Sequence, residues 1–230
     1  MSEALLAELL VVDVSRGVAG AYCCLLFRRL GAEVVRAEPP GGRGGPGRTE
    51  VLPYKHAGKK SITLDSSKPE GAALLLRLAE RADVLVTDAG LPPGLDYATL
   101  SRQNPRLVLT VVTAPPSSNG DSLFDGYFTG LNAFAATLLP LVNMTILGRG
   151  QQVEVDDAEC LAAAAFVADG QAQWPQAEGD EAFPPPPFRL TGLEPLSPAP
   201  RPGEHNDEVY CGLLGLSGEE VARLKEASVI

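Results

Sequence analysis

The sequence predicts an α/β fold in which helices cover both faces of a mainly parallel sheet. Apolar, β-branched runs of strand length recur between Leu9 and Val112, and helical segments separate them. Strands that alternate with helices at this spacing indicate parallel pairing, because two parallel neighbours need a crossover connection. The runs also lack the polar alternation of a half-exposed strand, as expected for strands buried on both faces.

The stretch from Leu9 to Glu38 forms the first unit of this fold. Leu9–Val14 predicts a buried strand, a glycine turn leads into a helix from about Ala19 to Leu30, and Glu33–Glu38 returns as the second strand. The helix should begin just beyond the end of the first strand, where its unpaired amides favour an anion. We therefore expect a phosphorylated ligand near this turn.

The later elements continue the alternation of strands and helices. A helix capped by Ser67, with Pro69 and Glu70 in its first turn, should end near Arg81. Further strands are expected at Ser61–Leu64, Ala82–Thr87, Leu107–Val112 and Gln152–Val155, and further helices at Asp96–Arg102, Tyr127–Leu147 and Ala158–Asp169. These elements give a domain over residues 1–170.

Two other segments differ in composition from that domain. Residues 39–50 are a Gly/Pro loop that carries Arg43 and Arg48, and residues 171–204 form an acidic, Pro-rich linker. In residues 205–230, Ser217 and Glu220 form an S-x-x-E capping box that predicts a short terminal helix. We expect this last segment to pack back on the main domain.

The stretch Tyr127–Leu147 contains no formal charge and is long enough to span a bilayer. Asn132, Pro140 and Asn143, together with the absence of aromatic or basic anchors at its start, argue against a membrane span. A buried or interface helix is the favoured interpretation.

Composition limits the classes of partner. The net charge of −10 argues against nucleic acid as the main partner. The first 60 residues carry nine Lys/Arg against six Asp/Glu, a net charge of +3, which leaves −13 for the remainder. An anionic ligand near the first unit fits this distribution, and an ordinary solvated surface is the alternative.

The cysteines show neither a metal site nor a disulfide pattern. No C-x-x-C pair is present, and the chain has only two histidines, so no zinc site is expected. The cysteines are Cys23, Cys24, Cys160 and Cys211. Adjacent thiols in a helix suggest core residues in a reducing compartment, and the acidic start lacks the basic region of a secretory signal, so a cytoplasmic location is expected.

Few catalytic patterns fit the chain. The first turn is G-x-x-G (Gly17 and Gly20) and lacks the glycine spacing of a NAD fingerprint. No G-x-S-x-G elbow exists. Asp125, in a loop just before the apolar helix, could attack an activated acyl group, although its spacing alone favours a simple N-cap.

Successive motifs resemble the class III CoA-transferases of the CaiB/BaiF type, a family that includes formyl-CoA transferase and α-methylacyl-CoA racemases. The matching segments run in family order from residue 8 to the C-terminus; they include VVDVSRGVAGAYC, LGAEVVRAEPPGG, GKKSITLD, DGYFTGLNAFAATLL, GRGQQVEVDDAE and RPGEHNDEVYCGLLGLS. The resemblance implies a Rossmann-like domain that binds acyl-CoA, usually in an interlocked dimer. It also implies acyl-CoA and a carboxylic acid acceptor as substrates, with no tightly bound cofactor and no metal.

The resemblance implies roles for individual residues. Asp125 matches the catalytic aspartate, which attacks the thioester, passes through a mixed anhydride and carries CoA as an enzyme thioester. The family's CoA contacts correspond to Arg16, Val18, Ala19, Lys59, Lys60 and Arg106. For each charged residue in this set, an ordinary surface charge is the alternative.

The chain also departs from the family pattern. PPSSNGD replaces the family's glycine-rich catalytic loop, the second domain is absent, and one residue is inserted between Asp125 and Gly130. Two hypotheses follow. The chain is a shortened CoA-transferase-like protein that acts through Asp125, or it is a non-enzymatic subunit or scaffold that pairs with itself or with a full-length relative.

Overall fold

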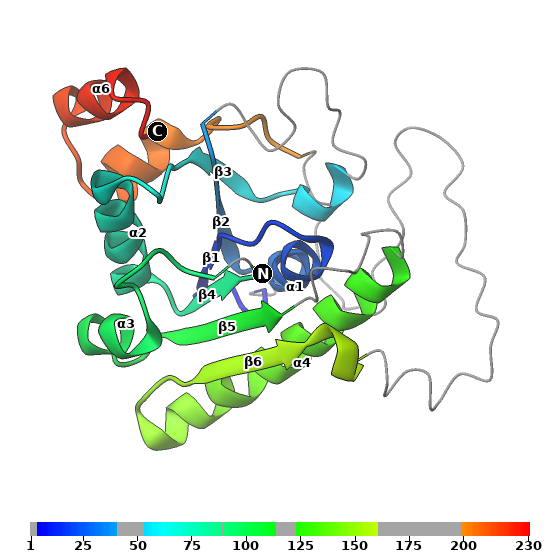
Figure 1. The fold of residues 1–230 in the computed structure, drawn as a ribbon. Coiled ribbons are helices and arrows are strands. Elements are labelled where there is room, and N and C mark those ends of the chain that lie inside the picture. The colour runs from blue at the N-terminus through cyan, green and yellow to red at the C-terminus, as the bar shows by residue number, and fades with distance from the viewer. Residues whose placement is uncertain (1–3, 41–52, 89, 114–122, 161–198) are drawn as a thin grey trace.

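The computed structural model describes residues 4–40, 53–88, 90–113, 123–160 and 199–230. Within these ranges, six parallel strands form one sheet in the order β3-β2-β1-β4-β5-β6 (Figure 1). The strands are β1 (Leu10–Asp13), β2 (Glu33–Glu38), β3 (Lys60–Thr63), β4 (Val84–Thr87), β5 (Val108–Thr113) and β6 (Gln152–Asp156). The predicted α/β fold with a parallel sheet is confirmed, and its strand order is that of a Rossmann-like sheet.

The central strands are buried on both faces, as their unbroken apolar runs predict. Val12 of β1 pairs with Val35 of β2 and Leu85 of β4. These three side chains belong to the hydrophobic cluster on one face, whereas Val11 and Val34 belong to the cluster on the other face. The sheet is therefore the middle layer of three.

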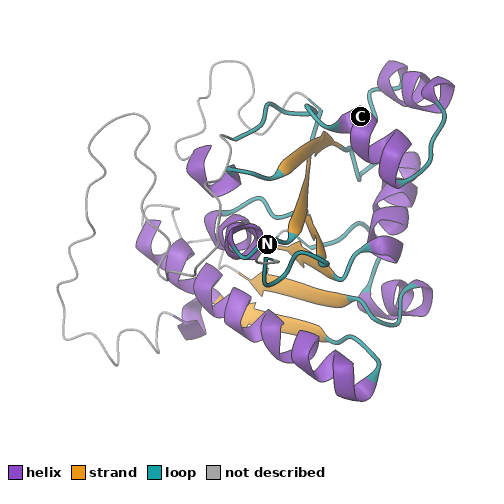
Figure 2. Ribbon diagram, turned by 180° about the vertical axis from the view of Figure 1, so that it is seen from behind, coloured by secondary structure: helices purple, strands orange, loops and turns teal. Residues whose placement is uncertain are grey.

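Helices α1 (Val18–Arg29) and α4 (Leu123–Leu147) cover one face, and Figure 2 shows α4 running across β5 and β6. Phe27 of α1 meets Phe134 of α4 edge to face, with 4.8 Å between ring centroids. Thr137 of α4 lies 2.8 Å from Thr110 of β5, Oγ1 to Oγ1, in the buried interface. The uncharged stretch thus belongs to a helix that packs on the sheet, and no helix among the described residues is long and apolar enough to cross a membrane.

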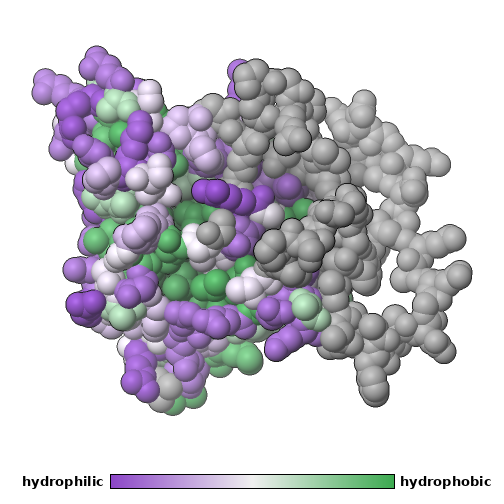
Figure 3. Space-filling view, in the orientation of Figure 1, coloured by the Kyte–Doolittle hydropathy of each residue, from purple (hydrophilic) through white to green (hydrophobic). Residues whose placement is uncertain are grey.

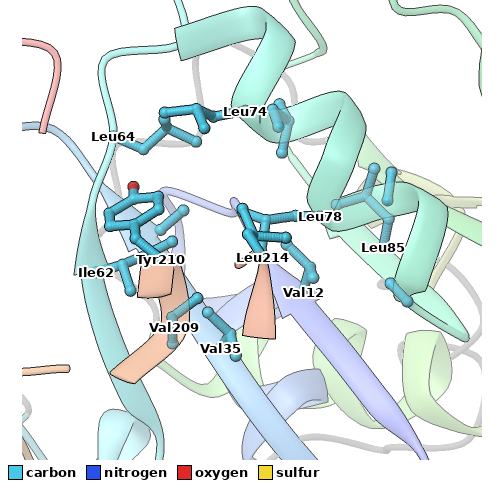
Figure 4. Packing of buried hydrophobic residues seen from close by; sticks show 14 of the residues in the cluster. Val12, Val35, Ile62, Leu64, Leu74, Leu78, Leu85, Val209, Tyr210 and Leu214 are labelled. Atoms are coloured by element: carbon cyan, nitrogen blue, oxygen red, sulfur yellow. The ribbon is translucent and has the colours of Figure 1, made fainter. Parts of the chain in front are cut away.

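The other face is covered by α2 (Pro69–Arg81), α3 (Tyr97–Gln103), the π-helix η2 (Glu208–Leu213) and α6 (Gly218–Glu226). Figure 4 shows side chains of α2 and η2 meeting those of the sheet, among them Leu78, Val209 and Tyr210. The terminal segment therefore contributes to the same core as the central strands. The wider division of the chain into a domain, a linker and a terminal segment stays a prediction.

The segment before η2 covers the outer edge of β3. The His205 amide donates to the Ser61 carbonyl at 2.9 Å, and the Ser61 amide donates to His205 Nδ1 at 3.1 Å. The Asn206 side chain accepts from the Thr63 amide at 2.8 Å and donates to Thr63 Oγ1 at 2.9 Å. These hydrogen bonds pair backbone groups of the edge strand β3 that would otherwise be unpaired at the edge of the sheet.

Some local predictions need correction. The N-cap of α2 is Lys68, whereas Ser67 donates its hydroxyl to Asp65 at 2.5 Å, so the predicted cap is wrong. Asp125 lies inside α4 and not in a loop before it, because that helix begins at Leu123. The capping box of Ser217 and Glu220 is confirmed.

Several predicted segments lie outside the described residues. They are the loop with Arg43 and Arg48, the whole PPSSNGD segment, the alanine-rich helix beyond Cys160, and the Pro-rich linker up to residue 198.

Candidate functional site

The sheet offers a ligand site where its strand order reverses. β1 and β4 are neighbours, with Asp13 opposite Val86, and their connections leave toward opposite faces of the sheet. In open α/β sheets this switch point opens a crevice beyond the carboxyl ends of the strands. Arg16 follows β1 and Asp88 follows β4 at this position.

The first turn of α1 already holds an anion from the chain itself. Asp88 Oδ1 accepts a hydrogen bond from the Arg16 amide at 2.6 Å, and its Oδ2 accepts one from the Gly17 amide at 2.5 Å. A Cβ atom at Gly17 would lie 2.9 Å from that Oδ2 atom. These two amides therefore bind a carboxylate of the chain itself, and a phosphorylated ligand at this turn stays a prediction.

A buried ion pair lies directly beneath this turn. The Lys59 ammonium donates to Asp13 Oδ2 at 2.8 Å and to the Ala21 carbonyl at 2.7 Å. Asp13 Oδ1 accepts from both the amide and the hydroxyl of Ser15, at 3.0 and 2.5 Å. Burial alone would raise the pKa of Asp13, but the charge and hydrogen bond of Lys59, with those of Ser15, hold the pKa well below its usual value.

The start of α4 crosses the start of α1 at very close range. A Cβ atom at Gly126 would lie 2.7 Å from Cβ of Val18, and one at Gly130 would lie 2.5 Å from the carbonyl oxygen of Ala19. Residue 125 belongs to the same first turn of α4 as Gly126. The fold thus packs the turn of α4 that contains residue 125 against α1, while the placement of the Asp125 side chain lies outside what the structure describes.

Three tyrosines from three elements meet beside this crossing. The rings of Tyr22 (α1) and Tyr127 (α4) are edge to face with centroids 4.7 Å apart, and Tyr54 stacks on Tyr127 at 5.8 Å. Tyr54 belongs to the short 3-10 helix η1 (Pro53–His56). Burial raises the pKa of each of these phenols, so they stay neutral at physiological pH.

The other predicted CoA contacts do not converge on this site. Lys59 is only 2% exposed and its ammonium pairs with Asp13 in the core, so its role as a CoA contact stays a prediction. Lys60 pairs with Glu33 at 3.0 Å and with Glu208 at 2.5 Å, on the far face of the sheet. Arg106 precedes β5 and Arg16 follows β1, so they lie at opposite edges, about 20 Å apart at roughly 3.3 Å per residue.

Glu38, the terminal acid of the second strand, is also engaged within the protein. It pairs with Arg36 at 3.3 Å and accepts a hydrogen bond from Ser61 at 2.6 Å, and all three side chains are buried. A role in holding a ribose, as in NAD-binding proteins, would require this network to open.

Sequence reasoning missed Asp88 and the pair formed by Thr129 and Asp157. Asp88 directly follows the buried run VLVT, so its place at the carboxyl edge could have been inferred from the strand alone. The hydroxyl of Thr129 in α4 donates to the buried carboxylate of Asp157, just after β6. The sequence could not show which residues Asp88, Thr129 and Asp157 contact, because those contacts depend on which helices and strands become neighbours.

Comparison with known proteins gives a consistent family signal. The profile of CoA-transferase family III matches residues 6–122. A succinate–glutarate CoA-transferase of Agrobacterium fabrum is 32% identical over 141 residues, which cover 53% of this chain and 35% of that protein. A subunit of the succinyl-CoA:(R)-benzylsuccinate CoA-transferase of Thauera aromatica is 30% identical over 218 residues, covering 74% of this chain and 52% of that subunit.

The fold comparison agrees. A CAIB/BAIF family protein from Brucella suis has a TM-score of 0.58 and 27% identity, over 72% of this chain and 58% of that protein. The chain therefore spans about half or less of the length of the curated relatives described above.

Proposed function

This chain belongs to CoA-transferase family III, and on that premise we propose that it binds an acyl-CoA and transfers CoA between carboxylic acids through Asp125. One observation carries the proposal. The turn of α4 that contains residue 125 packs against Val18 and Ala19, at the switch point of the sheet. A nucleophile and a binding site for a phosphorylated ligand would thus be neighbours.

In the proposed reaction the Asp125 carboxylate attacks the thioester carbonyl, and the CoA thiolate leaves to give a mixed anhydride. The thiolate then attacks the Asp125 carbonyl of that anhydride, which releases the first acid and leaves CoA on the enzyme as a thioester. The acceptor carboxylate repeats the two steps in reverse. It forms a new acyl-CoA and restores the free carboxylate of Asp125.

The ligand contacts in this proposal are a subset of those that the sequence predicts. Arg16 is exposed just beyond the carboxyl end of β1, and Val18 and Ala19 begin α1. Lys59 holds Asp13 from within the core and supports this turn from below. We leave Lys60 and Arg106 outside the ligand site, because one pairs with Glu33 and Glu208 and the other lies at the opposite edge of the sheet.

The covalent step is tested by mass spectrometry after incubation with succinyl-CoA and with other acyl-CoA esters. We expect a CoA adduct on the peptide that contains Asp125, and its loss together with turnover in Asp125→Ala. Asp121→Ala removes an acid four residues upstream and serves as the matched control. An unmodified Asp125 peptide with unchanged turnover in Asp125→Ala would exclude the catalytic role.

Ligand binding is tested separately by titration calorimetry with CoA. We expect Arg16→Ala to weaken CoA binding several-fold, by about the value of one charge-assisted contact to a phosphate. Arg106→Ala should leave the dissociation constant within about twofold, since its guanidinium lies at the far edge. A larger effect at Arg106 than at Arg16 would place the nucleotide of CoA at the other edge and refute this assignment.

A second candidate function is that of a non-enzymatic subunit, and the outer face of α4 favours it. Leu139, Val142 and Ile146 are 72%, 67% and 77% exposed, and Leu131 and Ala135 continue the same stripe along the helix. Figure 3 shows hydrophobic residues reaching the lower margin of the molecule, where Figure 1 draws α4. Exposed apolar patches of this kind mark association surfaces.

Light scattering decides whether this stripe associates. A dimer, either with itself or with a full-length family member, should dissociate in the double variant Leu139→Lys/Val142→Lys. A wild-type protein that stays monomeric alone and with such a relative would exclude the subunit role. A cytoplasmic location is part of both proposals and rests on the sequence.

A further inference from the structure

We propose that Asp88 is a built-in competitor for the anion site of α1, so that CoA binds only when this carboxylate leaves the amides of Arg16 and Gly17. The inference rests on the proposed CoA site and adds a residue that sets its affinity. It starts from one observation, that the carboxylate is bound bidentately by both amides, at 2.6 and 2.5 Å.

The two amides can serve only one anion at a time. Each peptide N–H provides a single hydrogen, and Asp88 accepts those of Arg16 and of Gly17, the N-cap of α1. A phosphate placed beside the bound carboxylate would meet a like charge without gaining these donors. A phosphorylated ligand must therefore displace Asp88 in order to bind the amides of Arg16 and Gly17.

Other features of the site make this displacement feasible. Both hydrogen bonds lie at the protein surface, unlike the buried pair of Asp13 and Lys59 beneath them. Asp88 is followed by a loop whose Gly90 and Gly94 adopt positive φ values, and a Cβ atom at either glycine would meet nothing within 4 Å. The loop is therefore not packed against other atoms at these two positions.

Gly17 shows that this turn is shaped around the carboxylate. Its backbone angles, φ −92° and ψ −178°, suit any residue. The nearest atom to an added Cβ is Asp88 Oδ2 at 2.9 Å. The lack of a side chain at this position therefore makes room for Asp88 and is not required by the backbone.

The consequence for binding is quantitative. When a site is competent for only a fraction of the time, the apparent dissociation constant rises by the inverse of that fraction. A carboxylate that occupied the amides for about nine-tenths of the time would weaken CoA binding about tenfold. Removal of the carboxylate should recover this factor for any ligand that uses the two amides.

Calorimetric titration of Asp88→Ala with CoA and with inorganic pyrophosphate tests the inference. We expect both ligands to bind about tenfold more tightly than to the wild type, and Asp88→Asn to show a smaller gain in the same direction, because a neutral amide oxygen is a weaker acceptor. Glu80→Gln removes one negative charge from the exposed surface of α2 and should change neither affinity by more than about twofold. Urea denaturation of each variant confirms that it is folded. Asp88→Asn keeps the shape of the side chain and replaces Asp88→Ala as the test variant if Asp88→Ala does not fold.

The outcomes separate this inference from the proposed function. CoA binding that is unchanged or weaker in both Asp88 variants, with wild-type binding intact, would overturn the competition alone. Tighter pyrophosphate binding without CoA binding to any variant would support the competition and refute CoA as the ligand. Failure of both ligands to bind the wild type and both variants would overturn both proposals.

Discussion

Asp13 and Lys59 are the most buried ion pair in the described part of the chain, and both lie beneath the start of α1. Their side chains are 1% and 0% exposed, and the Ser15 hydroxyl and the Ala21 carbonyl complete their hydrogen bonds. A buried pair of this kind contributes little net stability compared with apolar residues, but the loss of one partner strands the other charge. The pair therefore makes the position of the first turn depend on both residues.

Lys59→Met should destabilise the fold by about 3–5 kcal/mol, because it leaves the Asp13 carboxylate buried without a counter-charge. Urea denaturation followed by circular dichroism measures this loss. Lys60→Met is the matched control, since its pairs with Glu33 and Glu208 are partly exposed and should contribute less than about 1 kcal/mol. Equal losses at the two lysines would contradict the structural role of Lys59.

The same ion pair should make the free energy of unfolding depend on pH in the acidic range. Asp13 has a folded pKa below its ordinary value of 3.8, so the unfolded chain binds its proton first as the pH falls. The contribution of the ionised Asp13 carboxylate to the free energy of unfolding is complete above about pH 5. Below that pH it is lost progressively, by up to about 1.4 kcal/mol per pH unit. The difference in unfolding free energy between the wild type and Asp13→Asn/Lys59→Met, followed from pH 6 to pH 3, isolates this group. A difference that does not vary with pH would contradict the lowered pKa.

At this scale the sequence predicts residue types better than partners. It marks Lys59 as a positive charge near an anion site, but the charge that it meets is Asp13, 46 positions away. Likewise, Asp88 is visible as the residue after a buried strand, whereas its contact with the Gly17 amide spans 71 positions. Both pairings depend on the order of strands in the sheet, which local patterns do not contain.

Among the elements, the crossing of α4 over α1 decides whether a site can form. The apolar, uncharged pattern predicts the existence of α4 and its burial, but its start was expected at Tyr127 and lies at Leu123. The earlier start places residue 125 in the helix, in the turn whose Gly126 packs against Val18. Helix boundaries are the least certain part of a sequence-based prediction, because capping and packing shift them by several residues.

Gly130→Ala should separate these two helices. The added Cβ would lie 2.5 Å from the Ala19 carbonyl oxygen, which is backbone and cannot turn aside. We expect a loss of about 1–3 kcal/mol in unfolding free energy, although alanine is intrinsically the better helix former by about 1 kcal/mol. CoA transfer, where Asp125 acts as proposed, should fall by more than tenfold.

Gly218→Ala is the control for this experiment, since its Cβ would meet nothing within 4 Å at the start of α6. It should leave stability within about 0.5 kcal/mol. A Gly130→Ala protein as stable as this control would mean that the close crossing does not exist in solution.

Over the whole molecule, the sheet is completed by residues from the far end of the chain. His205 and Asn206 bond the outer edge of β3, and Tyr210 donates its hydroxyl to the Thr63 carbonyl at 2.6 Å. The Asp65 amide donates to the Val229 carbonyl at 2.7 Å, which fixes the last turn beside the exit of β3. The capping box predicted the terminal helix from local sequence, but nothing local indicated that the preceding residues would cover a sheet edge.

The deletion of residues 205–230 should therefore abolish cooperative unfolding and lead to aggregation. It uncovers the edge of β3 and removes Val209 and Tyr210, which are fully buried against the central strands. A shorter deletion of residues 218–230 keeps the bonds of His205, Asn206 and Tyr210, so it should retain a transition at lower urea concentration. Size-exclusion chromatography and urea denaturation distinguish these states, and a synthetic peptide of residues 199–230 added to the longer deletion should restore part of the folded signal. A monomeric 1–204 protein with the wild-type transition would show that the sheet is complete without its C-terminal edge.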